Sequence, residues 1–462
     1  MMYGSAEKRV LLLVSSLSSF LVPYTVSSLN VALPVIGSAL SLDAVTLGWI
    51  NTAYLLTTSV SIIPLGKVAD IYGRKRIFIL GNIIFAIASL VAAFSSSGNL
   101  LISARAVQGI GGAMIFATSV AIVTEVFMPG ERGKAIGIIT ATVYAGLSVG
   151  PVIGGILTEH LGWPSIFLIN VPVALVVIFL TVTSLKQEWK YINTLGIDPV
   201  GILLYVLMLG GCMYGLASLP SVRGFISLTA GLFFILIFIN WEKRQFEPLL
   251  NISVFSENHV FLFSNIAAMI NYATVFAVGF LVSLSLQFNR GINPALTGII
   301  LLSQPLVQTI VSPMSGHFSD SIEPRKIATI GMVFSTFGLV ILLLTLSGRP
   351  LPFVICGLLV LGLGYGLFSS PNTNAIMSSV SRKNLGMASG MVSTMRAIGQ
   401  LMSLAIAMIV FSLIIGTVQI TPSVYGQLEK SISISIVIFI LLGLVGVYTS
   451  YSRGNLAPSP LE

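Results

Sequence analysis

The sequence has few charged residues, few cysteines and few histidines, and each shortage excludes a class of protein. Only 8% of the 462 residues are charged, whereas a soluble domain carries about 25%. The two cysteines support neither a disulfide framework nor a zinc site, and the three histidines are scattered. No G-x-x-x-x-G-K-[ST] phosphate loop and no nucleophile–base cluster occurs. The sequence therefore predicts no catalytic residues, no metal, no cofactor and no ATP.

Apolar residues are abundant instead. They make up 55% of the chain, and the mean hydropathy is +0.99, so lipid is the predicted solvent for most of it. The first apolar stretch lacks a persuasive cleavage site and is interpreted as a retained helix. Apolar windows long enough to cross a bilayer predict an all-α polytopic membrane protein with fourteen spans, near residues 10–34, 46–66, 77–97, 100–124, 134–158, 164–184, 199–218, 224–241, 259–287, 296–318, 327–347, 351–378, 387–415 and 431–452.

Basic residues alternate between the two sides of these spans. With the N-terminus inside, 17 of the 23 lysines and arginines fall in inside segments and four in outside segments. Because basic residues gather in cytoplasmic loops, both termini are predicted to be cytoplasmic in a plasma-membrane protein. The same distribution accounts for the net charge of +8 without a basic patch. We therefore expect the lipid bilayer, and no nucleic acid, as a partner.

Short glycine motifs repeat along the chain. Residues 133–137 and 386–390 share a Gly-x-Ala-x-Gly pattern at an offset of 253 positions. Gly66 and Asp70 recur as Gly316 and Asp320 at an offset of 250 positions. This predicts two parallel six-helix halves, residues 1–185 and 259–462, joined by residues 186–258, which carry two additional transmembrane helices.

The loop between the second and third spans holds the most specific motif. Residues 66–76 read Gly-Lys-Val-Ala-Asp-Ile-Tyr-Gly-Arg-Lys-Arg, which resembles the helix 2–3 loop of major facilitator superfamily transporters. The resemblance implies that Asp70 and Arg74 form a charge network that holds the outward-facing state, within the motif that starts at Gly66 and turns at Gly73. Glu125, near the cytoplasmic end of the fourth span, is a candidate third member of this network. The alternative is a tight turn whose charges only set topology. The six-plus-two-plus-six pattern resembles the fourteen-helix drug:proton antiporter branch.

Two further motifs resemble those of the same branch. Arg105 and Gln108 stand in R-x-x-Q-G on the fourth span, which is linked in the family to proton transfer, although Arg105 is also close enough to the span end to snorkel. The fifth span carries an antiporter-type G-x-x-x-G-P-x-x-G-G motif, in which small residues let helices approach closely and which implies export: Gly146, Gly150, Pro151, Gly154 and Gly155.

Neutral polar residues and one arginine are expected to face a cavity. Arg396 lies about ten residues into the thirteenth span, roughly 15 Å deep, where facing lipid costs at least about 2.5–3.5 kcal/mol. It is therefore a third candidate for coupling, besides Arg105 and Gln108. Amides and phenols at membrane depth suit amphiphilic organic molecules; for Asn372 and Asn374, bonding between helices is an equal alternative. The cavity candidates are Asn30, Asn51, Tyr54, Tyr144, Gln287, Gln304, Asn372 and Asn374.

The chain departs from the family at one position. Many members of the branch have an acid five residues before the sequence Asn-Val-Ala-Leu-Pro, and here Thr25 stands in its place. None of the 15 acids lies at mid-membrane by sequence, although a proton antiporter usually needs a titratable group there. The export fold is thus expected without a visible proton site.

These observations predict a secondary active transporter that exports amphiphilic organic compounds, such as drugs, by proton antiport with alternating access. One alternative is an exporter of a specific endogenous metabolite or lipid with different coupling, which the missing acid favours. A second alternative is a non-transporting membrane sensor or scaffold, for which a degraded loop motif and long soluble appendages would be expected.

Overall fold

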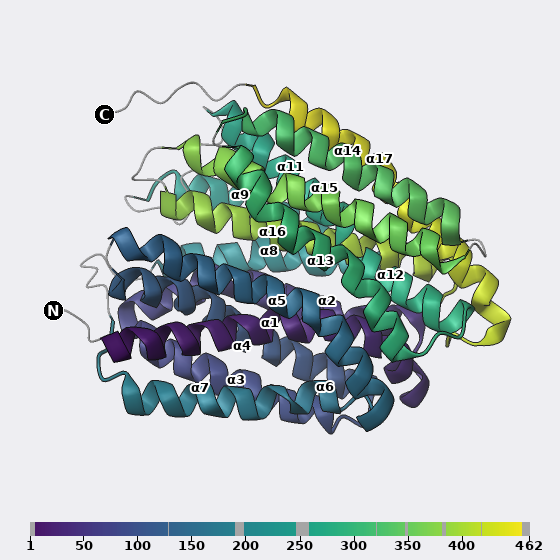
Figure 1. Cartoon of the computed structure of the whole chain (residues 1–462), viewed down its shortest axis with the longest axis horizontal. Helices are drawn as coiled ribbons and strands as arrows, with labels where there is room; N and C mark the ends of the chain where they lie inside the picture. The colour runs from purple at the N-terminus through teal and green to yellow at the C-terminus, as the bar shows by residue number, and fades with distance from the viewer. Residues whose placement is uncertain are drawn as a thin grey trace. The chain divides into compact units, whose positions relative to one another are not determined.

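The computed structural model describes residues 5–127, 129–189, 198–245, 258–319, 321–346, 350–380, 385–416 and 418–454. Throughout these ranges the regular structure is helical, with no β-strand. The chain forms two compact units, residues 1–202 with 292–299, and residues 203–291 with 300–462 (Figure 1). Linker residues 190–197 and 246–257, and Asp320 of the second loop motif, lie outside the described residues. The predicted domain boundaries stay a prediction.

The first unit is a bundle in which α1 packs on α5, α4 packs on both α2 and α3, and α7 packs on α1 and α3. Polar side chains start two of these helices. Asp43 accepts from the backbone amides of Val45 and Thr46, and Ser97 accepts from that of Leu100, which satisfies amides that have no partner within the helix. The helices are α1 (Ser5–Ala39), α2 (Ala44–Tyr72), α3 (Arg74–Ala93), α4 (Gly98–Val126), α5 (Pro129–Leu161), α6 (Ser165–Leu168) and α7 (Asn170–Ser184).

The second unit repeats this packing order. Its α11 packs on α16, α14 packs on α15, and α17 packs on α11 and α14, as expected for an internal repeat. The first turns of α13, within residues 292–299, belong to the first unit, as do the first residues of α8. The elements are α8 (Pro199–Ser218), α9 (Val222–Glu242), α11 (His259–Val275), α12 (Val278–Leu284), a π-helical segment (Ser285–Asn289), α13 (Pro294–Phe318), α14 (Pro324–Leu346), α15 (Leu351–Ser378), α16 (Leu385–Ile414), a short 3₁₀ turn (Pro422–Val424) and α17 (Tyr425–Ser452).

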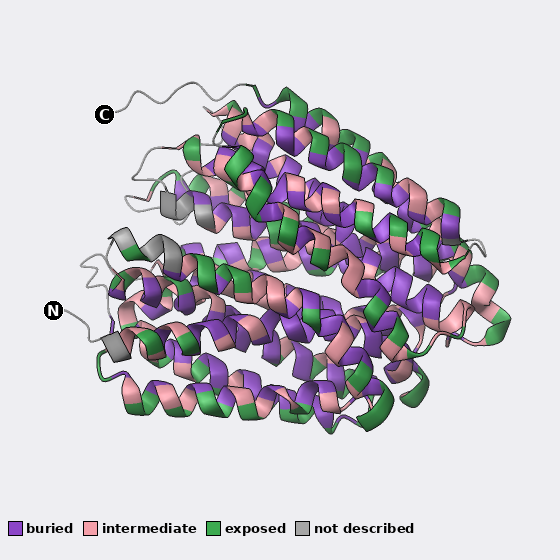
Figure 2. Cartoon of the chain, in the orientation of Figure 1, coloured by how far each residue is buried: buried purple, intermediate pink, exposed green. Residues whose placement is uncertain are grey.

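Within the described residues, 13 helical segments are long and apolar enough to cross a membrane. Large apolar side chains on their outer faces are exposed; Phe179 of α7, for example, is 66% exposed (Figure 2). Such surfaces suit lipid rather than water. The chain is therefore a multi-pass membrane protein.

The predicted span at residues 46–66 is the one that is absent from these 13 segments. It forms a helix, α2, but its sequence is rich in hydroxyl and amide side chains. Thr57 donates to Ala106 O at 2.8 Å and Thr58 to Gly109 O at 3.0 Å, so these hydroxyls bind the backbone of α4. A helix buried against its neighbours in this way does not need a fully apolar sequence.

Candidate functional site

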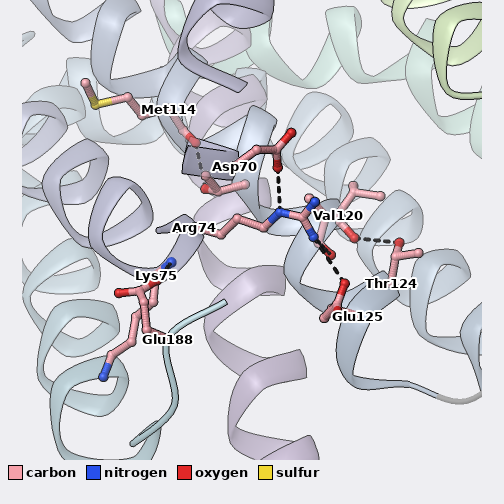
Figure 3. Close-up of polar contacts among 10 residues, drawn as sticks. Asp70, Arg74, Lys75, Met114, Val120, Thr124, Glu125 and Glu188 are labelled. Carbon is pink, nitrogen blue, oxygen red and sulfur yellow. Dashed lines mark hydrogen bonds and ion pairs between the residues drawn. The ribbon is translucent and has the colours of Figure 1, made fainter. Parts of the chain in front are cut away.

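The loop between α2 and α3 brings three predicted charges together (Figure 3). Gly73 has φ of +119° and separates the two helices, a backbone conformation that glycine adopts readily. The Arg74 Nε atom donates to Asp70 Oδ1 at 2.8 Å, and Nη1 reaches Glu125 Oε2 at 3.5 Å and Ala121 O at 3.2 Å. Arg74 therefore bridges the end of α2 and the end of α4.

This network is only partly shielded from solvent. The side chain of Arg74 is 17% exposed, that of Asp70 36% and that of Glu125 58%. Ion pairs in such surroundings contribute at most about 1 kcal/mol each. The contacts therefore hold helix ends in place yet are weak enough to break during a conformational change. Gly66 lies outside the network and faces Ala117 of α4.

Arg105 is fully buried in the first unit, as is Gln108. The Arg105 Nη1 atom donates to Gln108 Oε1 at 2.6 Å, and Nε donates to Ile50 O at 3.3 Å. The guanidinium carbon lies 4.2 Å from the centre of the Tyr54 ring, a cation–π distance. The arginine thus turns into the bundle, and the alternative that it snorkels to the surface is wrong.

Gln108 links this arginine to a longer buried chain of polar groups. Its Nε2 donates to Ser89 Oγ at 2.7 Å, and Asn170 Nδ2 lies 3.5 Å from the same oxygen. The hydroxyl of Thr25 lies 3.2 Å from Asn170 Oδ1. All five side chains are at most 1% exposed. This buried polar chain crosses α4, α3, α7 and α1 and ends at Thr25, where the resemblance to the antiporter branch predicted an acid.

Sequence reasoning missed the two middle members of this buried polar chain. Ser89 and Asn170 are ordinary neutral residues in apolar spans, and only their position in the bundle joins them to Gln108 and Thr25. The described acids in the candidate spans lie toward the span ends. The buried chain therefore carries one positive charge, on Arg105, and no carboxylate among its members.

The glycine motif of α5 packs against α1, as its small residues predict. A Cβ atom at Gly146 would lie 2.6 Å from Phe20 O, and one at Gly154 would lie 2.7 Å from the Cα atom of Ser28. A Cβ atom at Gly150 would approach Ser27 Oγ even more closely. Gly155 and Pro151 instead face the start of α13, at Pro294 and Gly298 within the same unit.

The cavity candidates of the first unit are not equivalent. Asn51 is buried and donates to Asn30 Oδ1 at 2.7 Å, so this pair joins α2 to α1. Tyr54 is buried beneath the Arg105 guanidinium. Tyr144 is half-buried on α5 and remains the more accessible of the two phenols.

Arg396 is exposed on α16 in the second unit. Its Nε atom donates to the Tyr272 hydroxyl at 3.1 Å, and its guanidinium carbon lies 5.4 Å from the centre of that ring. The Tyr272 ring in turn meets Tyr365 edge-on, with centroids 5.6 Å apart. The two tyrosines therefore hold one side of the arginine.

The asparagines of α15 bond to neighbouring helices. The buried Asn372 donates to Ser264 O at 3.1 Å and accepts from Arg453 Nη1 at 2.7 Å. Asn374 donates to Ser319 Oγ at 3.0 Å. Of the two alternatives predicted for these residues, the structure therefore shows hydrogen bonding between helices.

Arg453, just after α17, is one of the 17 basic residues counted in the inside segments, yet it is only 1% exposed. It contacts Asn372 and Ser264 as described, which ties the end of α17 to α15 and α11. Burial lowers the pKa of its guanidinium to about 10, and the nearby Glu323 carboxylate opposes this shift. Arg453 therefore keeps its charge at neutral pH.

The remaining cavity candidates add little to the site. Gln287 donates to Ser283 Oγ at 3.0 Å within the same helical segment, and Gln304 is half-buried on α13. Among the described residues, no group of three or more His, Cys, Asp or Glu side chains could hold a metal ion. Which of these residues contact a substrate stays a prediction.

Comparison with known sequences identifies relatives over most of the chain. The riboflavin transporter RibZ of Clostridioides difficile is 31% identical over 84% of this chain and 85% of its own length. The multidrug resistance protein Stp of Mycobacterium tuberculosis is 30% identical over 86% of this chain and 74% of its own. The methylenomycin A resistance protein of Bacillus subtilis is 28% identical over 87% of both chains. The two resistance proteins among these relatives confirm the predicted resemblance to drug-efflux transporters.

Solved structures confirm the fold. The crystal structure of the peptide transporter POT in complex with sulfate superposes with a TM-score of 0.71 at 16% identity, over 96% of this chain and 95% of that one. A bacterial homologue of the lysosomal transporter Spinster gives a TM-score of 0.70 at 15% identity, over 98% of both chains. The sequence model of the Major Facilitator Superfamily matches residues 15–403 and 264–450. The chain belongs to the major facilitator superfamily.

Proposed function

We propose that this protein is a secondary active transporter that exports amphiphilic organic compounds by proton antiport with alternating access. The observation that carries the proposal is the Asp70–Arg74–Glu125 network at the α2–α3 turn. Positive-inside signalling needs no acid, yet Asp70 and Glu125 both contact the same arginine. Weak contacts that join three helix ends are suited to an element with two arrangements.

In this proposal α8 and α9 are an additional transmembrane pair, which gives fourteen spans with α2 included. Both helices are long and apolar enough to cross a bilayer. They pack on each other through glycines: a Cβ atom at Gly211 would lie 2.9 Å from the Cα of Gly231. Both termini and the Arg74 turn then face the cytoplasm of a plasma-membrane protein, because that orientation places most basic residues inside.

The arginines in the spans bear on the path of the substrate and on the path of the proton. Arg396 is exposed on a membrane-spanning helix, and facing lipid there costs at least about 2.5–3.5 kcal/mol. We infer that it faces a water-filled space through which substrate passes. An arginine keeps its proton at ordinary pH, so Arg105, Gln108 and Arg396 shape the proton's route through charge and hydrogen bonds rather than release a proton themselves.

A second candidate function is transport of one specific metabolite with different coupling. Two observations favour it. The relative RibZ is a riboflavin transporter, and Thr25 replaces the acid that a proton antiporter would use, with its hydroxyl tied into the chain through Asn170.

Transport in proteoliposomes separates these functions. The purified protein is reconstituted, and movement of a fluorescent amphiphilic dye and of riboflavin is measured with and without an imposed pH gradient. Dye movement that is driven by the gradient supports drug:proton antiport. Gradient-independent movement of riboflavin alone supports the second function, and no movement of either compound, or of a wider panel, refutes transport.

A further inference from the structure

The segment that follows α7, residues 185–189, contacts the turn that carries Arg74. Trp189 O accepts from the Arg74 amide at 2.8 Å, and Glu188 Oε1 accepts from the Lys75 amide at 2.9 Å. The Lys75 ammonium donates to Leu185 O. Figure 3 shows Glu188 beside Lys75, where α3 begins. Residues distant in sequence therefore bind the first two backbone amides of α3.

These contacts supply a helix cap that α3 does not have locally. The residue before Arg74 is Gly73, which has no side chain to accept from the free amides at the helix start. The first amides of a helix need an acceptor, and a carboxylate placed there also interacts favourably with the helix dipole. Glu188 provides that carboxylate from the segment that follows α7, a helix that packs on α3.

The capping segment is fixed by its own burial. Leu185 is 1% exposed and Trp189 is 4% exposed, so apolar side chains anchor both ends of the segment. The Glu188 side chain between them is 24% exposed and also lies 3.7 Å from Arg76 Nε. A Cβ atom at Gly73 would lie 2.5 Å from the Glu188 carboxyl carbon, which shows how closely the carboxylate approaches the turn.

We propose that Glu188 is a positioning residue for the gate: by capping α3 it fixes the backbone from which Arg74 reaches Asp70 and Glu125. The proposal rests on the proposed transport function. Arg74 is the first residue of α3, so the direction of its side chain depends on how firmly that first turn is formed. A released first turn lets Arg74 leave its two carboxylate partners, although Glu188 touches neither of them.

The first test measures the cap without transport. Hydrogen exchange is followed in the purified full-length protein for peptides that cover residues 73–76. We expect Glu188→Ala to raise the exchange rate of this turn about fivefold, as expected from the loss of a typical N-cap. Glu188→Asp should restore part of the protection, and Gln187→Ala, at an exposed neighbouring position, should exchange like the wild type. Unchanged exchange in Glu188→Ala refutes the cap.

The second test measures the gate in proteoliposomes. Glu188→Ala should lower the maximal transport rate about fivefold with unchanged KM, because substrate contacts are intact. In an Arg74→Ala background the same change should have no further effect, since the residue that Glu188 positions is gone. A normal rate in Glu188→Ala, or an additive loss in the double variant, overturns the proposal. If the wild type itself transports nothing, the transport function fails, while the exchange test still decides the cap.

Discussion

Replacing Gln108 by leucine should destabilise the first unit more than replacing Thr25 by valine at the other end of the buried polar chain. The change removes the acceptor that lies 2.6 Å from Arg105 Nη1 and the donor that lies 2.7 Å from Ser89 Oγ. A hydrogen bond to a charged group contributes about 1.5–3 kcal/mol, and a hydrogen bond between membrane helices averages about 0.6 kcal/mol. Because both partners are buried, we expect a total loss of about 2–4 kcal/mol.

Thr25→Val is the matched comparison at the far end of the chain. Its hydroxyl also bonds to Leu21 O at 2.8 Å within its own helix, so only the 3.2 Å contact with Asn170 is lost between helices. Such contacts in membrane proteins average about 0.6 kcal/mol. Thr124→Val, at an exposed hydroxyl of α4 that bonds only within the helix, is the control.

The assay is reversible unfolding in mixed detergent micelles, which gives a free energy of unfolding for each variant. Gln108→Leu should be the least stable variant, Thr25→Val should lose under about 1 kcal/mol, and Thr124→Val should match the wild type. If Gln108→Leu is as stable as Thr25→Val, the buried arginine does not depend on this amide, and the reasoning fails.

Three other predictions concern gating, topology and the exposed arginine. Asp70→Asn and Arg74→Ala should each lower transport on the order of tenfold in proteoliposomes while the protein still inserts; a normal rate in Asp70→Asn would make the loop a topology signal only. In a variant without native cysteines, Ser452→Cys should react with an impermeant thiol reagent only after cells are opened, and labelling of intact cells would contradict a cytoplasmic C-terminus. Arg396→Lys should keep part of the transport rate and Arg396→Ala should lose it, because lysine retains the positive charge that Arg396 supplies to the transport path. Full transport with normal pH dependence in Arg396→Ala would rule out a role for this charge.

Much of the fold follows from the sequence because lipid imposes simple rules. Long apolar runs become helices, since backbone groups in a bilayer have no other partners. Within the two units α1 packs on α5 and α11 packs on α16, whereas the parallel halves that the glycine repeat predicted stay a prediction. The polar helix α2 shows where the rule weakens, because its threonines bond to the α4 backbone and reduce the apolar signal that marks a span.

The candidate site was predictable only where its members are close in sequence. Asp70 and Arg74 stand four residues apart across a glycine turn, so their contact follows from local geometry. Arg105 and Gln108 stand three apart on one helix face. Arg453 shows the limit: its charge predicted a loop, but Asn372 and Ser264 draw its guanidinium into the bundle.

Glu188 shows why the remaining contacts were not predictable. A carboxylate in a loop is ordinary, and 113 residues separate it from the Lys75 amide that it binds. Its role depends on two facts that no sequence window contains together, a glycine that leaves α3 without a local cap and two buried side chains that hold the segment against it. In our proposal the α2–α3 loop supplies the arginine of the gate, and the distant segment that caps α3 sets the direction of its side chain.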